Sequence, residues 1–300
     1  MKFRCYYFGL LILALNLSCS SHVSYSPYYI STVDNNVCKK LSGEVLLYAI
    51  FVDSRYTQPW SEYDIRSTLD SIKKMKVWLE KNAKENGIPL DISISHHQNG
   101  RTIPIAQNLA HKTLSGTLFS PFPSFGIPKL DRWSNIIAKT AGTSLPKDTS
   151  KIVKTPNRLT DRERLIARLR DIYKTDNVAV MYFINDYYSE DLSLALYTGR
   201  NDAPEYAIVS FKKPAVIAHE FLHLFGALDL YISPFERKKK NIKRLALINK
   251  EFPREIMAFA HRQIDSLDIS PLTKYLIGWQ NELDEKTRQL VLGNIKVAKY

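Results

Sequence analysis

Two histidines and a glutamate lie close together in the segment Ala218–Tyr231. His219 and His223 are four residues apart, so on a helix both imidazoles project from one face and can bind the same metal ion. Glu220 is too poorly placed to complete this chelate, but its carboxylate can reach a water molecule on the metal. Zinc lowers the pKa of such a water toward neutrality, and a carboxylate can then take its proton. The spacing therefore predicts a hydrolytic centre with one zinc ion, two histidine ligands and Glu220 as general base.

The residues after His223 predict a third ligand. Gly226 suits a chain that leaves a helix through a conformation that only glycine adopts at low cost. Such a turn would bring Asp229 back toward the metal and leave a fourth position for water. An ordinary core helix with two hydrogen-bonded histidines is the alternative, but a buried glutamate beside them would then cost free energy without a function.

The pattern His219-Glu220-x-x-His223-x-x-Gly226-x-x-Asp229 resembles the extended zinc motif of the metzincin metallopeptidases. Its aspartate is the third ligand in the form known from snapalysin-like enzymes. The resemblance implies a zinc-dependent endopeptidase, a hydrolase that acts on peptide bonds in proteins or peptides.

Metzincins also have a methionine turn beneath the metal, and the resemblance makes Met257 the candidate for it. In some members a tyrosine two residues after this methionine approaches the metal. Phe259 occupies that position here, so no phenol is expected there.

Two other functions are compatible with the same residues. One is a metallopeptidase of another clan, in which a downstream glutamate such as Glu251 or Glu255 is the third ligand. The other is a non-catalytic surface lipoprotein that keeps the fold as a binding module. The presence of Glu220 argues against the second, since a binding module needs no general base.

The elements that must position these residues follow from the pattern of apolar side chains. The run from Glu44 to Val52 predicts a strand that is buried on both faces. Capping signals at Ser61 and Thr160 begin two helices, which extend to about Asn86 and Tyr173. The remaining predicted elements are strands at 90–95, 178–184, 192–198 and 206–211, and helices that begin at Pro214 and Pro271.

This order of elements predicts an α/β fold: a metzincin-like twisted mixed sheet of about five strands flanked by helices. The sheet should be mostly parallel with an antiparallel edge strand at 192–198, along which an extended peptide substrate would bind as a further strand. A small C-terminal subdomain after Asp229 would lie below the active-site cleft. Residues 98–158, with six prolines, predict an insertion with a short helix at 133–139.

The N-terminus predicts export. Lys2 and Arg4 precede an apolar run, and residues 1–18 have the organisation of a signal peptide. Cys19 lies where bacterial lipoproteins carry their lipidated cysteine, although Asn16 replaces the usual leucine. We therefore expect a lipid-anchored tether at 19–43 and a metallopeptidase domain at 44–300, on a bacterial membrane and facing the periplasm or the cell surface. Without acylation, a Cys19–Cys38 disulfide is the alternative.

The composition and net charge limit the kinds of binding partner that are expected. Hydrophobic residues make up 45% of the chain, which is typical of a globular protein, and the net charge is +12. No basic-aromatic nucleic-acid module is evident, so the charge is interpreted as surface character and no nucleic-acid partner is expected. We expect a monomer that binds a peptide or protein substrate and contacts the membrane through its lipid anchor.

The lipoprotein hypothesis predicts a mature protein that partitions into detergent and incorporates labelled fatty acid. Cys19→Ala should yield a soluble exported form, because the acylated sulfur is lost. Metabolic labelling and N-terminal sequencing test this. A wild-type protein that carries no lipid and begins at another residue would contradict it.

Overall fold

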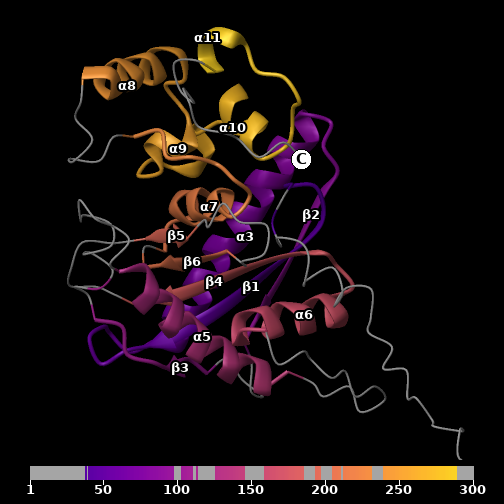
Figure 1. Cartoon of the computed structure of the whole chain (residues 1–300), viewed down its shortest axis with the longest axis vertical. Helices are drawn as coiled ribbons and strands as arrows, with labels where there is room; N and C mark the ends of the chain where they lie inside the picture. The colour runs from indigo at the N-terminus through magenta and orange to yellow at the C-terminus, as the bar shows by residue number, and fades with distance from the viewer. Residues whose placement is uncertain are drawn as a thin grey trace, which may run out of the picture.

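The computed structural model describes an α/β structure in which helices cover both faces of a mixed sheet (Figure 1). The described residues are 38, 40–97, 103–110, 113, 126–145, 159–185, 193–196, 205–210, 212–231 and 239–288. Residues 1–18, Cys19 and most of the expected tether lie outside them. No helix in the described part of the chain has the length and hydropathy that a membrane span requires.

The sheet has the strand order β2-β1-β4-β6-β5, and β3 pairs with β1 at one end. Every pairing is parallel except that of β5 with β6, in which Ala195 lies opposite Ala207. The predicted mixed sheet with an antiparallel edge strand is therefore confirmed. The strands are β1 (Gly43–Asp53), β2 (Leu90–His96), β3 (Ile105–Ala106), β4 (Asn177–Ile184), β5 (Leu194–Leu196) and β6 (Tyr206–Val209).

The sheet has six strands where about five were expected. The additional strand, β3, lies inside the segment 98–158 and contains only two residues. It is too short to produce an alternating pattern, and its pairing with Val52 and Asp53 of β1 creates it. The rest of the described part of this segment includes α5 (Ile127–Thr143), which is longer than the predicted helix at 133–139.

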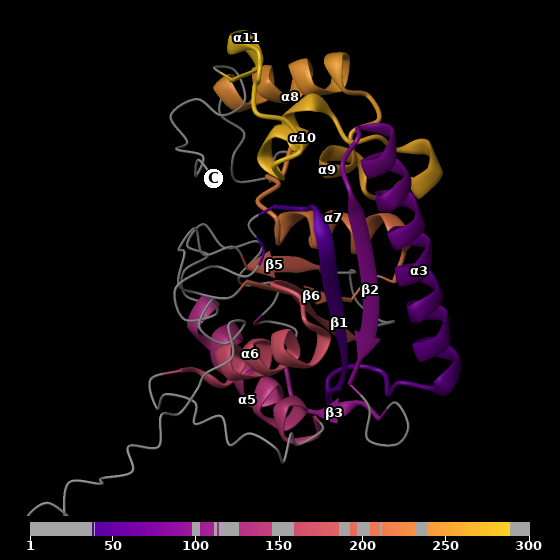
Figure 2. The same cartoon turned by 90° about the vertical axis from the view of Figure 1, so that its right-hand side faces the viewer.

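Strand β1 is the centre of the fold because it is buried on both faces. Its apolar residues from Val45 to Val52 are at most 2% exposed. Helices α3 (Glu62–Glu85) and α7 (Pro214–His223) cover one face of the sheet, and α5 and α6 (Asp161–Tyr173) cover the other (Figures 1 and 2). Both predicted capping boxes are present, at Ser61 in front of α3 and at Thr160 in front of α6.

The chain after α7 forms a group of short helices on the side of α7 away from the sheet (Figure 2). These are α8 (Lys239–Glu251), α9 (Ile256–Phe259), the 3-10 helix η3 (Ile264–Ser266), α10 (Pro271–Leu276) and α11 (Glu285–Thr287). The start of the described chain joins this group, because the Leu41 N–H donates to the carbonyl of Ile277 and the Trp279 Nε1–H donates to the carbonyl of Leu41. Cys38 and Leu41 are 3% and 0% exposed. These two residues therefore pack with the core, although they precede residue 44, where the metallopeptidase domain was expected to begin.

Candidate metal centre

Helix α7 is buried on nearly all sides, which explains its strongly apolar sequence. Pro214 occupies the first turn, where a missing N–H costs little. The polar side chains of His219 and Glu220 are among the buried residues, at 5% exposure each. Buried polar groups of this kind require partners or a function.

The helix ends in a glycine turn that reverses the chain. Gly226 has a φ of 96°, in the left-handed region that residues with a Cβ rarely adopt. Its N–H donates to the carbonyl of His223 at 3.0 Å, and the Ala227 N–H donates to the carbonyl of Leu222 at 3.2 Å. These two bonds form a Schellman motif. The turn directs the following residues back along the helix, as the sequence predicted, and Asp229 returns beside the two histidines.

Three ligand atoms form a nearly equilateral triangle. The Nε2 atoms of His219 and His223 lie 3.1 Å apart, and each lies 3.1 Å from Oδ1 of Asp229. Ligand atoms at about 2.0–2.2 Å from a tetrahedral metal ion would be separated by about 3.3 Å, so the triangle has nearly the required size. Within the described residues this is the one group of three histidine, cysteine or acidic side chains that could hold a metal ion.

Backbone carbonyl groups orient both imidazoles. Nδ1 of His223 lies 2.7 Å from the carbonyl oxygen of Ala227, and Nδ1 of His219 lies 3.4 Å from that of Ile256. A carbonyl oxygen only accepts, so each Nδ1 donates its proton to its carbonyl, and Nε2 is the atom that each ring presents to a metal. Support of this kind from a second layer of groups is general for histidine ligands.

The segment around Met257, in α9, contacts the ligand group from the side of α7 that faces away from the sheet (Figure 2). Met257 is fully buried, and its carbonyl accepts a hydrogen bond from the N–H of Leu230, the residue after Asp229. Together with the Ile256 carbonyl, this segment supports two of the three ligand positions. At Phe259 the ring is covered by the guanidinium of Arg262, 4.1 Å from its centroid.

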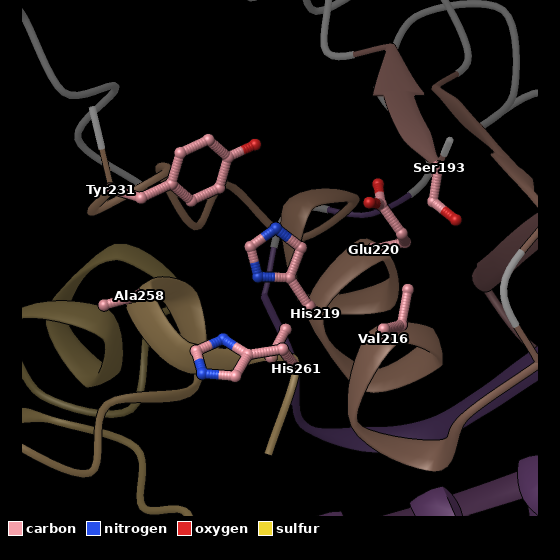
Figure 3. Close-up of a pocket in the computed structure, with 8 residues that line it drawn as sticks. Ser193, Val216, His219, Glu220, Tyr231, Ala258 and His261 are labelled. Atoms are coloured by element: carbon pink, nitrogen blue, oxygen red, sulfur yellow. The ribbon is translucent and has the colours of Figure 1, made fainter. Parts of the chain in front are cut away.

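One carboxylate oxygen of Glu220 has no hydrogen-bond donor among the described residues. This atom, Oε2, is buried. Burial raises the pKa of Glu220, while the charges of His219 and His223 and a hydrogen bond from the Ala195 N–H act in the opposite direction. Figure 3 shows its carboxylate directed into a pocket beside Ser193. This oxygen is therefore an acceptor that no described donor occupies, at the edge of the pocket.

The pocket has a volume of about 360 Å³ and opens next to the ligand triangle. The phenol of Tyr231 lies on the opposite side of His219 from Glu220 (Figure 3), and its ring centroid is 6.1 Å from that of His219. Tyr231 lines this pocket, but no spacing in the sequence predicted it as a site residue. The lining residues are Ser193, Val216, His219, Glu220, Tyr231, Ala258, Ala260 and His261.

The two other carboxylates considered as the third metal ligand, those of Glu251 and Glu255, do not lie beside the two histidines. Glu255 is buried and accepts hydrogen bonds from Met257, Ser270 and Thr273. Glu251 lies exposed at the end of α8. The carboxylate beside the two histidines is therefore that of Asp229.

The charges of the ligand group are strongly coupled. Burial by itself lowers the pKa of His223, but the neighbouring Asp229 carboxylate outweighs it and raises the pKa to about 9. Burial likewise raises the pKa of Asp229, but the two imidazoles outweigh it and hold that pKa well below its usual range. Imidazole binds metals in its neutral form, so a metal cation would replace the proton on His223.

No protein-family model, curated protein or solved structure matches this chain. The features that bear on its function are the ligand triangle, the buried Glu220 carboxylate and the pocket that His219 and Glu220 line.

Asp229→Ala should weaken the affinity for added zinc by more than about 100-fold, the upper range for residues that only support ligands. Two imidazoles alone would remain to hold the metal. Competition with a chelator of known affinity measures the loss. Glu251→Ala, the same change at an exposed acid, is the control and should bind zinc like the wild type. An Asp229→Ala protein that keeps its metal would show that another group is the third ligand.

Zinc affinity should rise with pH by about tenfold per unit between pH 6 and pH 8. The pKa of His223 is raised to about 9, so in this range the metal must displace one proton, and a higher pH removes that competition. Zinc titrations at several pH values measure the slope. Asp229→Asn removes the charge that raises this pKa, so its slope should be flatter; equal slopes would contradict the assignment.

Proposed function

We propose that this chain is a metzincin-type, zinc-dependent endopeptidase in which His219, His223 and Asp229 hold one zinc ion. The observation that carries the proposal is the orphaned Oε2 atom of Glu220, which is buried at the pocket beside the ligand triangle. Two imidazoles and one carboxylate, with a fourth position open, are a donor set typical of catalytic zinc. A bound zinc ion would lower the pKa of a coordinated water toward neutrality and polarise the carbonyl of the scissile peptide bond.

Glu220 would move the proton in this reaction. Its carboxylate accepts a proton from the attacking water and passes it to the nitrogen of the leaving amine. The Ala195 N–H on β5 holds the carboxylate in place, while Oε2 stays available. Burial keeps bulk water from competing for the same oxygen, which strengthens its interaction with the attacking water.

Tyr231 would stabilise the negative charge that develops on the carbonyl oxygen. Its phenol faces Glu220 across His219, so its hydroxyl can donate to an oxygen between them (Figure 3). A positioned donor of this type acts on the transition state more than on the ground state. Tyr231 would thus take the role of the tyrosine that some metzincins have two residues after the methionine, where this chain has Phe259.

The substrate would lie extended along β5. This strand is at the edge of the sheet, with β6 on one side and no described strand on the other. Ser193, immediately before β5, lines the pocket, and Ala195 contacts Glu220. A peptide added to this edge as a further strand would therefore pass beside the proposed base.

The proposed location is the outer side of a bacterial membrane. Its basis is the signal-like sequence of residues 1–18 and the position of Cys19, both outside the described residues. A monomer held by a lipid anchor would act on peptides or proteins at that surface.

Glu220→Gln should keep zinc bound but reduce peptide hydrolysis by at least about 10²–10⁴-fold, because the amide has the size of the carboxylate and cannot take a proton. A peptide-library digest followed by mass spectrometry measures the rate, and elemental analysis measures the zinc. Glu251→Gln, at the exposed end of α8, is the matched control and should cleave normally. Unchanged hydrolysis in Glu220→Gln would remove this residue from the mechanism.

A further inference from the structure

Glu255 is a buried carboxylate that the proposed reaction does not use. It is 1% exposed and immediately precedes α9. Its Oε1 atom accepts from the Met257 N–H at 3.1 Å and from the Thr273 hydroxyl at 2.9 Å, and its Oε2 atom accepts from the Ser270 N–H at 2.6 Å. Ser270 and Thr273 begin α10, so this one carboxylate joins the starts of α9 and α10.

The backbone strengthens the same junction. Glu255 and Asp268 form an isolated parallel β-bridge, and the Ile256 N–H donates to the carbonyl of Asp268 at 3.0 Å. Residues 255 and 256 are therefore held from the side of α10 by three hydrogen bonds, two from Ser270 and Thr273 to the Glu255 carboxylate and one from the Ile256 N–H to Asp268. The position of the first turn of α9 depends on these contacts.

The other side of that turn faces the ligand group. The Ile256 carbonyl lies 3.4 Å from Nδ1 of His219, and the Met257 carbonyl accepts from the Leu230 N–H at 3.1 Å. The first contact orients a ligand ring, and the second holds the residue next to Asp229. A shift of α9 would move both supports together.

We propose that Glu255 is a positioning residue for the metal centre, which acts through the carbonyl groups of Ile256 and Met257. Its own oxygens are directed to α9 and α10 and not to the ligand triangle. The proposal rests on the metal centre of the proposed function, but not on peptide hydrolysis.

A carboxylate suits this junction better than an amide. Hydrogen bonds to an ionised acceptor are about twice as strong as neutral ones, and three of them offset part of the cost of burying the charge. Burial raises the pKa of Glu255, and the hydrogen bonds from Ser270, Met257 and Thr273 oppose this. In Glu255→Gln the amide NH₂ would face the N–H of either Ser270 or Met257, so one backbone donor always loses its acceptor.

The test compares zinc affinity in the full chain and in two variants, Glu255→Gln and Glu255→Ala, by competition with a chelator. Groups that support metal ligands typically contribute about 10- to 100-fold in affinity. We expect a loss in this range, smaller for the Gln variant, which keeps the volume and part of the bonding. In ¹⁵N spectra of the zinc-bound chain, the Nδ1 proton of His219, which faces the Ile256 carbonyl, should be visible, and in the variants it should exchange faster with water.

A control separates positioning from general destabilisation. Arg162→Met removes a buried guanidinium that contacts Asp131 and Ser134 between α5 and α6, on the other face of the sheet. Urea unfolding of the metal-free proteins should show a loss of stability in this variant too, but its zinc affinity should stay within about twofold of the wild type, since no support of the ligands is touched. Equal losses of affinity in the Arg162 and Glu255 variants, or none in the Glu255 variants, would overturn the positioning role.

The same measurements separate this inference from the proposed function. A wild-type chain that binds no zinc overturns both. Weakened zinc binding by the Glu255 variants of a protein that cleaves no peptide supports the positioning role and contradicts the hydrolase. If Glu255→Gln loses zinc while Asp229→Ala retains it, Glu255 is itself a ligand, and the positioning role is wrong.

Discussion

The candidate metal centre depends on the reversal of the chain at Gly226. A φ of 96° is costly for any residue with a Cβ, so the position requires glycine. The same turn has two consequences, because it presents the Ala227 carbonyl to Nδ1 of His223 and returns Asp229 to the two imidazoles. If the chain left α7 in another direction, Asp229 would no longer lie beside the histidines, and His223 would lose the Ala227 carbonyl that orients its ring.

The opposite side of the centre is built from a distant part of the chain. The Ile256 carbonyl that faces His219 comes from a residue 37 positions further on. Its segment is in turn attached to α10 through Glu255 and Asp268. The helices after α7 therefore do more than cover the core. They hold the Ile256 carbonyl in place against His219 of α7. Preorganisation of this kind is what a catalytic metal site requires.

The burial of Glu220 is the feature least compatible with a purely structural helix. A buried polar atom without a hydrogen bond costs about 1–3 kcal/mol, and α7 contributes to the core through its apolar residues without needing a carboxylate. The oxygen lies at a pocket that also contains Tyr231 and Ser193, from two other segments. This convergence of a buried carboxylate, a phenol and the segment of an edge strand beside the three candidate ligands is what supports the proposed hydrolase.

The sequence alone determined the features that depend on near neighbours. The ligand group spans only residues 219–229, so helical spacing and one glycine predicted its geometry, and the apolar run at 44–52 predicted the buried central strand. The structure alone decided what depends on distant neighbours. Strand β3 forms because it pairs with β1. The position of Tyr231 at the pocket depends on the surrounding fold. Glu255 was a possible ligand by sequence, and only the structure shows that its carboxylate binds Ser270 and Thr273. A carboxylate has the same local pattern whether it binds a metal or caps a helix, and only the donors that surround it in three dimensions distinguish the two.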